Sequence, residues 1–254
     1  MNNFFSSPPF ADGPAEFMLV TAAIVAAYAV FTLVGFGSGL IASTPLAALM
    51  PVARVIPLLA ILDFAGSGTR GWRTRQEVAW GALRQLFPGM LLGQLLGVLV
   101  LARLPARPMA VALGLFIVLQ GWRGLLKKAG AATGTVFPAY AYGLFGGILG
   151  GLFGSGGFVY AAYLERHLES RPAFRATQAV LIALSTGWRI VLCLSLGLID
   201  RELLATALLC GPAMVLGIHL GRRIDLRMSR DQLYRLLHGL LLASGLGLIA
   251  RFIG

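Results

Sequence analysis

Long apolar segments follow one another along the chain and are separated by short polar connections. A helix needs roughly 20 apolar residues to cross the hydrocarbon core of a membrane, and several segments reach about this length. The segments cover approximately residues 17–34, 39–50, 55–69, 78–101, 108–126, 136–153, 156–165, 174–199, 202–220 and 232–252. This pattern predicts an all-α polytopic membrane protein with no separate soluble domain.

Residues 1–16 precede the first apolar segment and contain several prolines. They lack the basic start and the small-residue cleavage site of a secretory signal peptide. We therefore expect them to form a retained N-terminal tail.

Two short motifs occur twice, which indicates an internal repeat. The Phe-Gly-Ser-Gly sequence of Phe36–Gly39 reappears at Phe153–Gly156, and the Gly-Thr-Arg sequence of Gly68–Arg70 is echoed by Gly187–Arg189. The alternative is chance similarity between glycine-rich helices. The repeat predicts two homologous halves of one membrane domain, residues 17–128 and residues 129–254.

The first two apolar pieces of each half allow two topologies. If they form one full crossing, the chain crosses eight times and Lys and Arg are divided poorly between the two sides. If they form a glycine-broken pair that turns back, each half adds three transmembrane helices and the halves are inverted repeats. Nearly the whole excess of positive charge then falls on one side, as the positive-inside rule requires. We prefer this second topology, with both termini outside.

The composition supports a membrane protein, since 57% of the residues are hydrophobic and 12% are charged, against roughly a quarter charged in soluble domains. The net charge of +11 lies in short loops, where it suits the cytoplasmic side of a cell inner membrane and contact with anionic membrane lipids. We therefore expect no nucleic acid partner. Neither the cysteines nor the histidines have the spacing of metal ligands, so no metal or cofactor is expected.

The paired motifs Gly35–Gly39 and Gly154–Gly157, together with the Arg-Ala-Thr-Gln-Ala-Val stretch at Arg175–Val180, resemble those of the TauE/SafE sulfite exporter family, also called the TSUP transporters. The resemblance spans nearly the whole chain, although Ser38 stands where the family often has glycine. It implies a membrane transporter that exports or takes up sulfite, sulfonates or related anions.

The glycine motifs are candidate substrate-binding sites. Irregular backbone is tolerated deep in a membrane only where protein buries it or where it lines a wet cavity. The helix that starts after each break presents free amide groups and a partial positive charge, which suits an anion. Helix packing and capping are the alternatives. The candidate binding residues at the breaks are Gly37, Ser38, Gly39, Ser43, Thr44, Gly154, Ser155 and Gly156.

Two ionisable residues interrupt apolar segments, where an unpaired charge is costly. Asp63 is a candidate for proton coupling, or else a structural partner of Arg70 or Arg189. Arg189 is the best single candidate for an anion ligand, because its guanidinium group matches the geometry of a sulfonate or carboxylate. On the same segment, Gln178, Ser185 and Thr186 either line the substrate path or form interhelical hydrogen bonds.

Together these features predict a secondary transporter that moves a small anion by alternating access, with possible proton coupling. A passive anion channel is the main alternative. A membrane-embedded enzyme is less consistent with the sequence, because no nucleophile with a base and no metal cluster is found. Glycine stripes such as Gly89, Gly93 and Gly97 would also permit a homodimer.

Overall fold

The computed structural model describes residues 14–35, 37–126, 137–223, 239, 242 and 245–250. The helices are α1 (Pro14–Val34), α2 (Ser38–Leu49), α3 (Val52–Arg73), α4 (Trp80–Arg103), α5 (Ala106–Leu126), α6 (Ala139–Phe153), α7 (Gly157–His167), α8 (Arg171–Ser195) and α9 (Arg201–Arg223), with a short 3-10 helix, η1 (Arg75–Glu77), after α3. No strand is found in these ranges. Each predicted apolar segment as far as residue 220 coincides with one helix.

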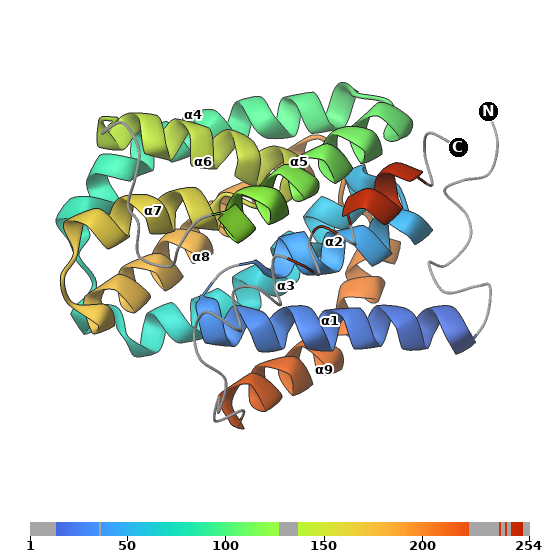
Figure 1. Ribbon diagram of the computed structural model, residues 1–254, viewed down its shortest axis with the longest axis horizontal. Helices are drawn as coiled ribbons and strands as arrows, with labels where there is room; N and C mark the ends of the chain where they lie inside the picture. Colours follow the sequence, from blue (N-terminus) through green and yellow to red (C-terminus); the bar gives the residue numbers. More distant parts are fainter. Residues whose placement is uncertain are drawn as a thin grey trace.

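Helices α3, α4, α8 and α9 are long and apolar enough to cross a membrane, while the apolar parts of α1, α2 and α6 are shorter. Most of the helices run roughly along the long axis of the molecule (Figure 1). The all-α polytopic membrane fold predicted from the sequence is therefore confirmed. The predicted segment 232–252 falls mostly outside the described residues, as do Phe36 and most of the N-terminal tail.

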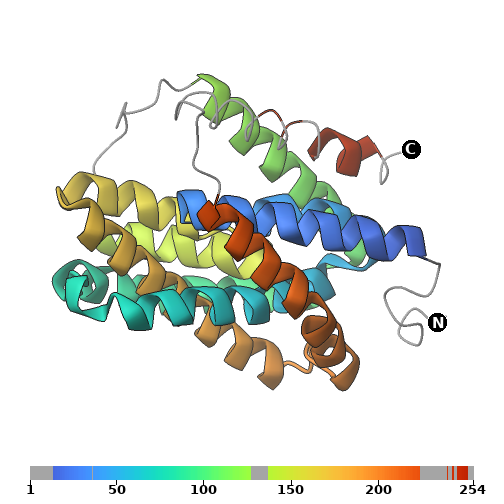
Figure 2. The same ribbon diagram turned by 90° about the horizontal axis from the view of Figure 1, so that it is seen from below.

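Glycine stripes allow two pairs of helices to pack with their backbones in contact. Gly89 and Gly93 of α4 lie against the backbone of α6, so that a β-carbon on Gly93 would be 2.1 Å from the Leu144 carbonyl oxygen. In the same way, Gly217 and Gly221 of α9 lie against the backbone of α1, and Figure 2 shows α9 crossing α1. The α4 glycine stripe therefore packs against α6 of the same chain and does not support a dimer interface. The homodimer stays a prediction.

The helix pairs follow a pattern that is symmetric between the halves. The first helix of each half packs on the fourth helix of the other half, which gives the pairs α1 with α9 and α6 with α4. The third helices, α3 and α8, pack on each other in opposite directions, because Gly71 contacts Val180 whereas Gly187 contacts Phe64. Opposite directions of equivalent helices are the geometry of inverted repeats. The inverted relation stays a prediction, which this packing supports.

Both helix breaks are built on glycine. Gly35 and Gly37 have φ angles of 92° and 99°, and Gly154 has a φ of 68°, all in the left-handed region that favours glycine. Gly154 ends α6 by donating its N–H to the carbonyl oxygen of Gly150 at 2.9 Å. The two breaks touch, since Gly39 lies directly against the backbone of Gly154.

The helices after the breaks turn back toward their starting side. Helix α2 begins at Ser38, whose hydroxyl bonds to Asp63 in the middle of α3, and ends just before α3 begins. Helix α7 returns along α6, with Tyr160 packed against Gly146. The glycine-broken pair of the preferred topology is therefore visible in both halves.

Apart from the two helix breaks, connections between the described helices lie at two ends of the molecule (Figure 1). At one end, Arg54 forms a salt bridge with Asp200 at 2.8 Å, which joins the start of α3 to the start of α9. At the other end, the backbone N–H of Ala79 donates to the hydroxyl of Thr177 at 2.9 Å. The connections that the charge pattern assigned to one side of the membrane thus share an end of the molecule, and the end that faces the cytoplasm stays a prediction.

Candidate functional site

A cavity lies where the two helix breaks meet, between the halves of the molecule. Its volume is about 30 Å³, whereas one water molecule needs roughly 10–15 Å³ measured in the same way. It is lined by Phe31, Gly37, Ser38, Leu40, Asp63, Gly154, Ser155, Gly156, Gly157, Phe158, Tyr160, Ile182, Ser185, Thr186 and Arg189. The cavity therefore has room for a compact ligand of a few atoms.

Arg189 of α8 places its guanidinium group in the wall of this cavity. The residue is 2% exposed, and its Nε and Nη1 atoms have no hydrogen-bond partner. Gly150 and Gly154 leave space beside it, because a β-carbon on either would lie 3.3 Å and 3.6 Å from the guanidinium nitrogens. Buried donors are normally satisfied, and a buried charge is costly without a partner. An anion in the cavity would supply the missing partner.

Asp63 of α3 lies across the cavity wall and is also buried. Its Oδ1 accepts hydrogen bonds from the hydroxyl groups of Tyr28 and Ser38, each at 2.7 Å. Within the described ranges, no Lys or Arg nitrogen lies within 4.0 Å of the carboxylate. The alternative of a structural ion pair with Arg70 or Arg189 is therefore wrong as a direct contact, although Arg189 attracts the carboxylate from a longer distance.

The start of α2 and the start of α7 both face the cavity through Ser38 and Gly157. No side chain caps either helix: the N-cap residues are Gly37 and Gly156, and neither has a capping hydrogen bond. The first amide groups of a helix have no partner within it and carry a partial positive charge. Two positive helix ends thus converge on the space beside Arg189.

The structure brings most of the predicted site residues together and leaves four outside the lining. Gly39 packs on Gly154 instead of facing the cavity. Ser43 donates to the carbonyl oxygen of Leu40 at 3.3 Å, and the buried Thr44 hydroxyl has no partner. Gln178 donates to the carbonyl oxygen of Gly157 at 2.7 Å and so supports the start of α7. The predicted residues that line the cavity are Gly37, Ser38, Asp63, Gly154, Ser155, Gly156, Ser185, Thr186 and Arg189.

The hydroxyl groups near Arg189 differ in the hydrogen bonds that they form within the protein. Thr186 donates to the carbonyl oxygen of Ile182 at 2.8 Å, and Ser155 donates to that of Phe153 at 3.0 Å. Ser185 accepts a hydrogen bond from the side-chain amide of Gln94. The protons of the Thr186 and Ser155 hydroxyls thus go to backbone carbonyls, whereas the Ser185 hydroxyl is held by a side chain of α4.

Three residues of this region were missed by the sequence reasoning. Tyr28 donates to Asp63, Tyr160 lines the cavity with an unpartnered buried hydroxyl, and Gln94 of α4 holds Ser185 while its own Oε1 has no partner. An amide in the middle of the apolar segment 78–101 was the one available signal. Two tyrosines in apolar helices look like ordinary core residues. Within the described part of the chain, no three His, Cys, Asp or Glu side chains are grouped as metal ligands.

Comparison with known proteins places this architecture in a family. A family profile described as "Sulfite exporter TauE/SafE" matches residues 19–248. A probable inner membrane transporter protein, TsaS of Comamonas testosteroni, is 30% identical over 75% of this chain and 81% of its own length. A probable sulfite/organosulfonate exporter, TauE of Cupriavidus necator, is 28% identical over 86% of this chain and 88% of its own. No solved structure matches.

The family match, the relative named as an inner membrane transporter and the apolar helices agree on the location, a multi-pass position in the inner membrane. The profile covers both helix breaks and all of the residues that line the cavity. The chain therefore belongs to the sulfite exporter TauE/SafE family.

Proposed function

We propose that the protein is a secondary transporter that moves sulfite, a sulfonate or a related small anion across the cytoplasmic membrane by alternating access. The observation that carries the proposal is the buried Arg189, with guanidinium nitrogens that lack partners beside a cavity between two helix breaks. The description of the family and the name of one relative, a probable sulfite/organosulfonate exporter, support a sulfur-containing anion as the substrate.

The groups around the cavity suit an oxyanion. Arg189 offers charge-assisted hydrogen bonds to two oxygens at once, and the two helix starts add positive potential from opposite halves. The hydroxyl of Ser185 adds a donor without a fixed charge. A cavity of about 30 Å³ fits a compact charged group better than a long organic chain.

The position of the cavity supports alternating access. Transporters with internal repeats commonly bind substrate near the midplane, where broken helices of the two halves meet, and expose it by rocking one part against the other. Here the α2 start comes from the first half, and the α7 start and Arg189 come from the second. Relative movement of the halves would therefore open the cavity to one side or the other.

Asp63 supports proton coupling of this movement. An ionised Asp63 repels an anion bound at Arg189, so binding of a proton and binding of the anion favour each other. The carboxylate is also bonded to Ser38 at the first residue of α2 and to Tyr28 of α1. Protonation would thus change the hydrogen bonds that hold the first helix break in place.

Transport by the purified protein in liposomes tests this proposal. Uptake of labelled sulfite and short sulfonates should saturate with concentration. It should also be accelerated by unlabelled anion on the opposite side, which is the counterflow expected of a carrier. Flux that rises linearly without counterflow would indicate a channel, and no flux of any tested anion by folded protein would overturn the proposal.

A further inference from the structure

Three arginines from separate helices come together at the end of the molecule that is predicted to face the cytoplasm. They are Arg70 near the end of α3, Arg175 in the first turns of α8 and Arg222 at the end of α9, and we call them the arginine cluster. Gly66 of α3 lies beside Ile218 of α9, and Arg70 and Arg222 each follow four residues later in helices that start at the same end of the molecule. On the other side, Gly71 of α3 lies against Val180 of α8, five residues after Arg175. The charges of Arg175 and Arg222 accordingly act on the Arg70 guanidinium.

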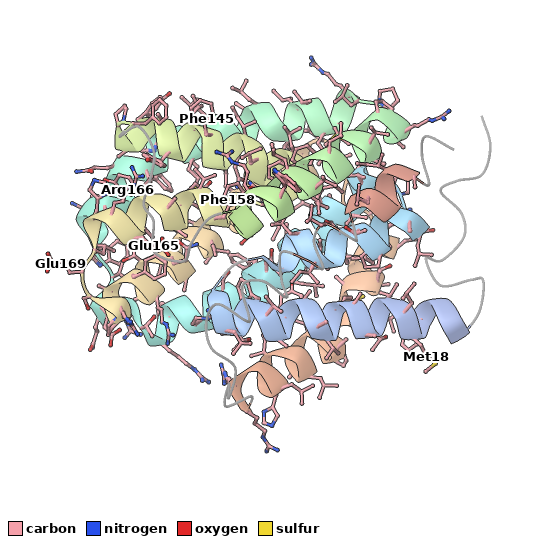
Figure 3. The ribbon with its side chains drawn as sticks, viewed as in Figure 1. Met18, Phe145, Phe158, Glu165, Arg166 and Glu169 are labelled. Carbon is pink, nitrogen blue, oxygen red and sulfur yellow. The ribbon has the colours of Figure 1, made fainter. Side chains whose placement is uncertain are left out.

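The described residues contain no direct ion pair that would balance the positive charge of the arginine cluster. Within the described part of the chain, no carboxylate lies within 4.0 Å of any of the three guanidinium groups. Of the acidic residues of this end, Glu77 lies in η1, and Glu165 and Glu169 lie around the end of α7 (Figure 3). Like charges held close together repel one another, and arginine groups of this kind are used by proteins to bind oxyanions.

The cluster is connected to the cavity by one aromatic ring. The Arg70 guanidinium lies over the ring of Phe31, 4.7 Å from its centroid, and Phe31 itself lines the cavity. The same ring packs edge-to-face on Tyr28 at 5.8 Å, and Tyr28 donates to Asp63. Asp63 and Arg70 are seven positions apart on α3, which corresponds to about 10 Å along the helix axis. Phe31 therefore stands between the cluster and the cavity.

We propose that the arginine cluster is a second oxyanion-binding site, which holds an anion at the cytoplasmic entrance of the cavity behind the Phe31 ring. Its ligand is a compact oxyanion, either a sulfite or sulfonate group in solution or the phosphate of an anionic lipid headgroup. The identification of the soluble ligand with the substrate rests on the proposed function. The binding site itself does not.

Calorimetric titration of sodium sulfite into the protein, held in nanodiscs of zwitterionic lipid, tests the site directly. We expect wild type to bind two anions and the Arg175→Gln/Arg222→Gln variant to bind one. In an Arg189→Gln background the cluster alone remains, and adding the two cluster substitutions should weaken sulfite binding at least about tenfold. The matched control is Arg73→Gln/Arg223→Gln, which removes two exposed charges from the same end and should change the affinity less than about twofold.

The outcomes separate this proposal from the proposed function. If the cavity does not bind anions, wild type binds one sulfite, and the cluster variant loses it. If the cluster does not bind sulfite, wild type and the cluster variant bind it equally, which overturns a soluble anion as the ligand of the cluster. Equal weakening in the control variant would also overturn it, because general surface charge would then explain the effect.

A second set of nanodiscs containing phosphatidylglycerol distinguishes the two sources of oxyanion. A lipid headgroup at the cluster would block sulfite binding there, and mass spectrometry of the intact complex would find bound phosphatidylglycerol in wild type and in the control but not in the cluster variant. A free anion as ligand would leave sulfite binding unchanged by this lipid. Binding of neither ligand at the cluster would overturn the proposal.

Discussion

Gly39 and Gly154 bring the two helix breaks into backbone contact. A β-carbon on Gly39 would lie 2.6 Å from the carbonyl oxygen of Gly154, closer than real β-carbons approach other atoms. One residue stands just inside α2, and the other ends α6 in the opposite half. This contact fixes the two positive helix starts beside the same cavity, which the proposed anion site requires.

Gly39→Ala should separate the two breaks and reduce both stability and transport. Overpacking of a close contact typically costs about 1–3 kcal/mol, and sulfite uptake should fall because the helix starts no longer converge. Thermal unfolding in detergent and uptake by proteoliposomes measure the two effects.

Gly211→Ala is the matched control, since a β-carbon at Gly211 in α9 meets no atom within 4 Å. Alanine is favoured over glycine inside a helix by about 1 kcal/mol, so this variant should be equally stable or more stable. Equal thermal stability and equal sulfite uptake in Gly39→Ala and Gly211→Ala would contradict the proposed role of the contact.

Asp63→Asn should uncouple transport from the proton gradient. Wild-type uptake should be faster when the side that holds the anion is more acidic, because proton and anion binding favour each other. The amide cannot release a proton, so anion exchange should continue in Asp63→Asn while its response to the pH gradient is lost. Uptake and counterflow with and without the gradient measure these two activities.

Asp200→Asn makes the same chemical change at an exposed carboxylate paired with Arg54. Exposed ion pairs contribute about 0–1 kcal/mol, so this variant should keep the wild-type response to the pH gradient. A gradient response retained by Asp63→Asn would remove the proposed role of Asp63.

Tyr28→Phe and Ser38→Ala should each destabilise the protein by about 1–3 kcal/mol, because each removes a hydrogen bond from a buried carboxylate. Both donors bond to the same oxygen of Asp63, so the effects should not be additive in the double variant. Chemical unfolding of the single and double variants measures this coupling. Ser195→Ala loses a hydroxyl bonded only within its own helix, and it should change stability by less than about 0.5 kcal/mol. If the stability losses of Tyr28→Phe and Ser38→Ala simply added in the double variant, the two donors would act independently on Asp63, contrary to this prediction.

The fold was largely predictable because lipid imposes a simple length and polarity rule on helices. The glycine motifs located both breaks, since a helix cannot pass through residues such as Gly37 and Gly154 in the left-handed conformation. The charge pattern also predicted which connections share an end of the molecule. The contact between Gly39 and Gly154 was not predictable, because it depends on how the two halves pack.

Part of the site followed from chemistry and part of it did not. Asp63 and Arg189 stood out as charges in apolar segments, but their position in one cavity depends on the packing of α3 against α8. Ser43 and Thr44 were placed in the predicted site because they follow Ser38 in sequence. Five and six residues of helix correspond to turns of about 140° and 240°, which point them to other faces of α2. Tyr28, Tyr160 and Gln94 show their roles only through hydrogen-bond geometry.

The measurement that tests the central claim most directly is sulfite uptake by Arg189→Gln in proteoliposomes. Loss of one member of a buried charged pair typically costs about 2–5 kcal/mol, so kcat/KM should fall by about 30-fold or more, and Arg189→Lys should recover part of it by restoring the charge. Arg103→Gln, which removes an exposed charge at the predicted outer end, should behave as wild type. Wild-type uptake by a folded Arg189→Gln protein would contradict the assignment of the cavity as the anion site.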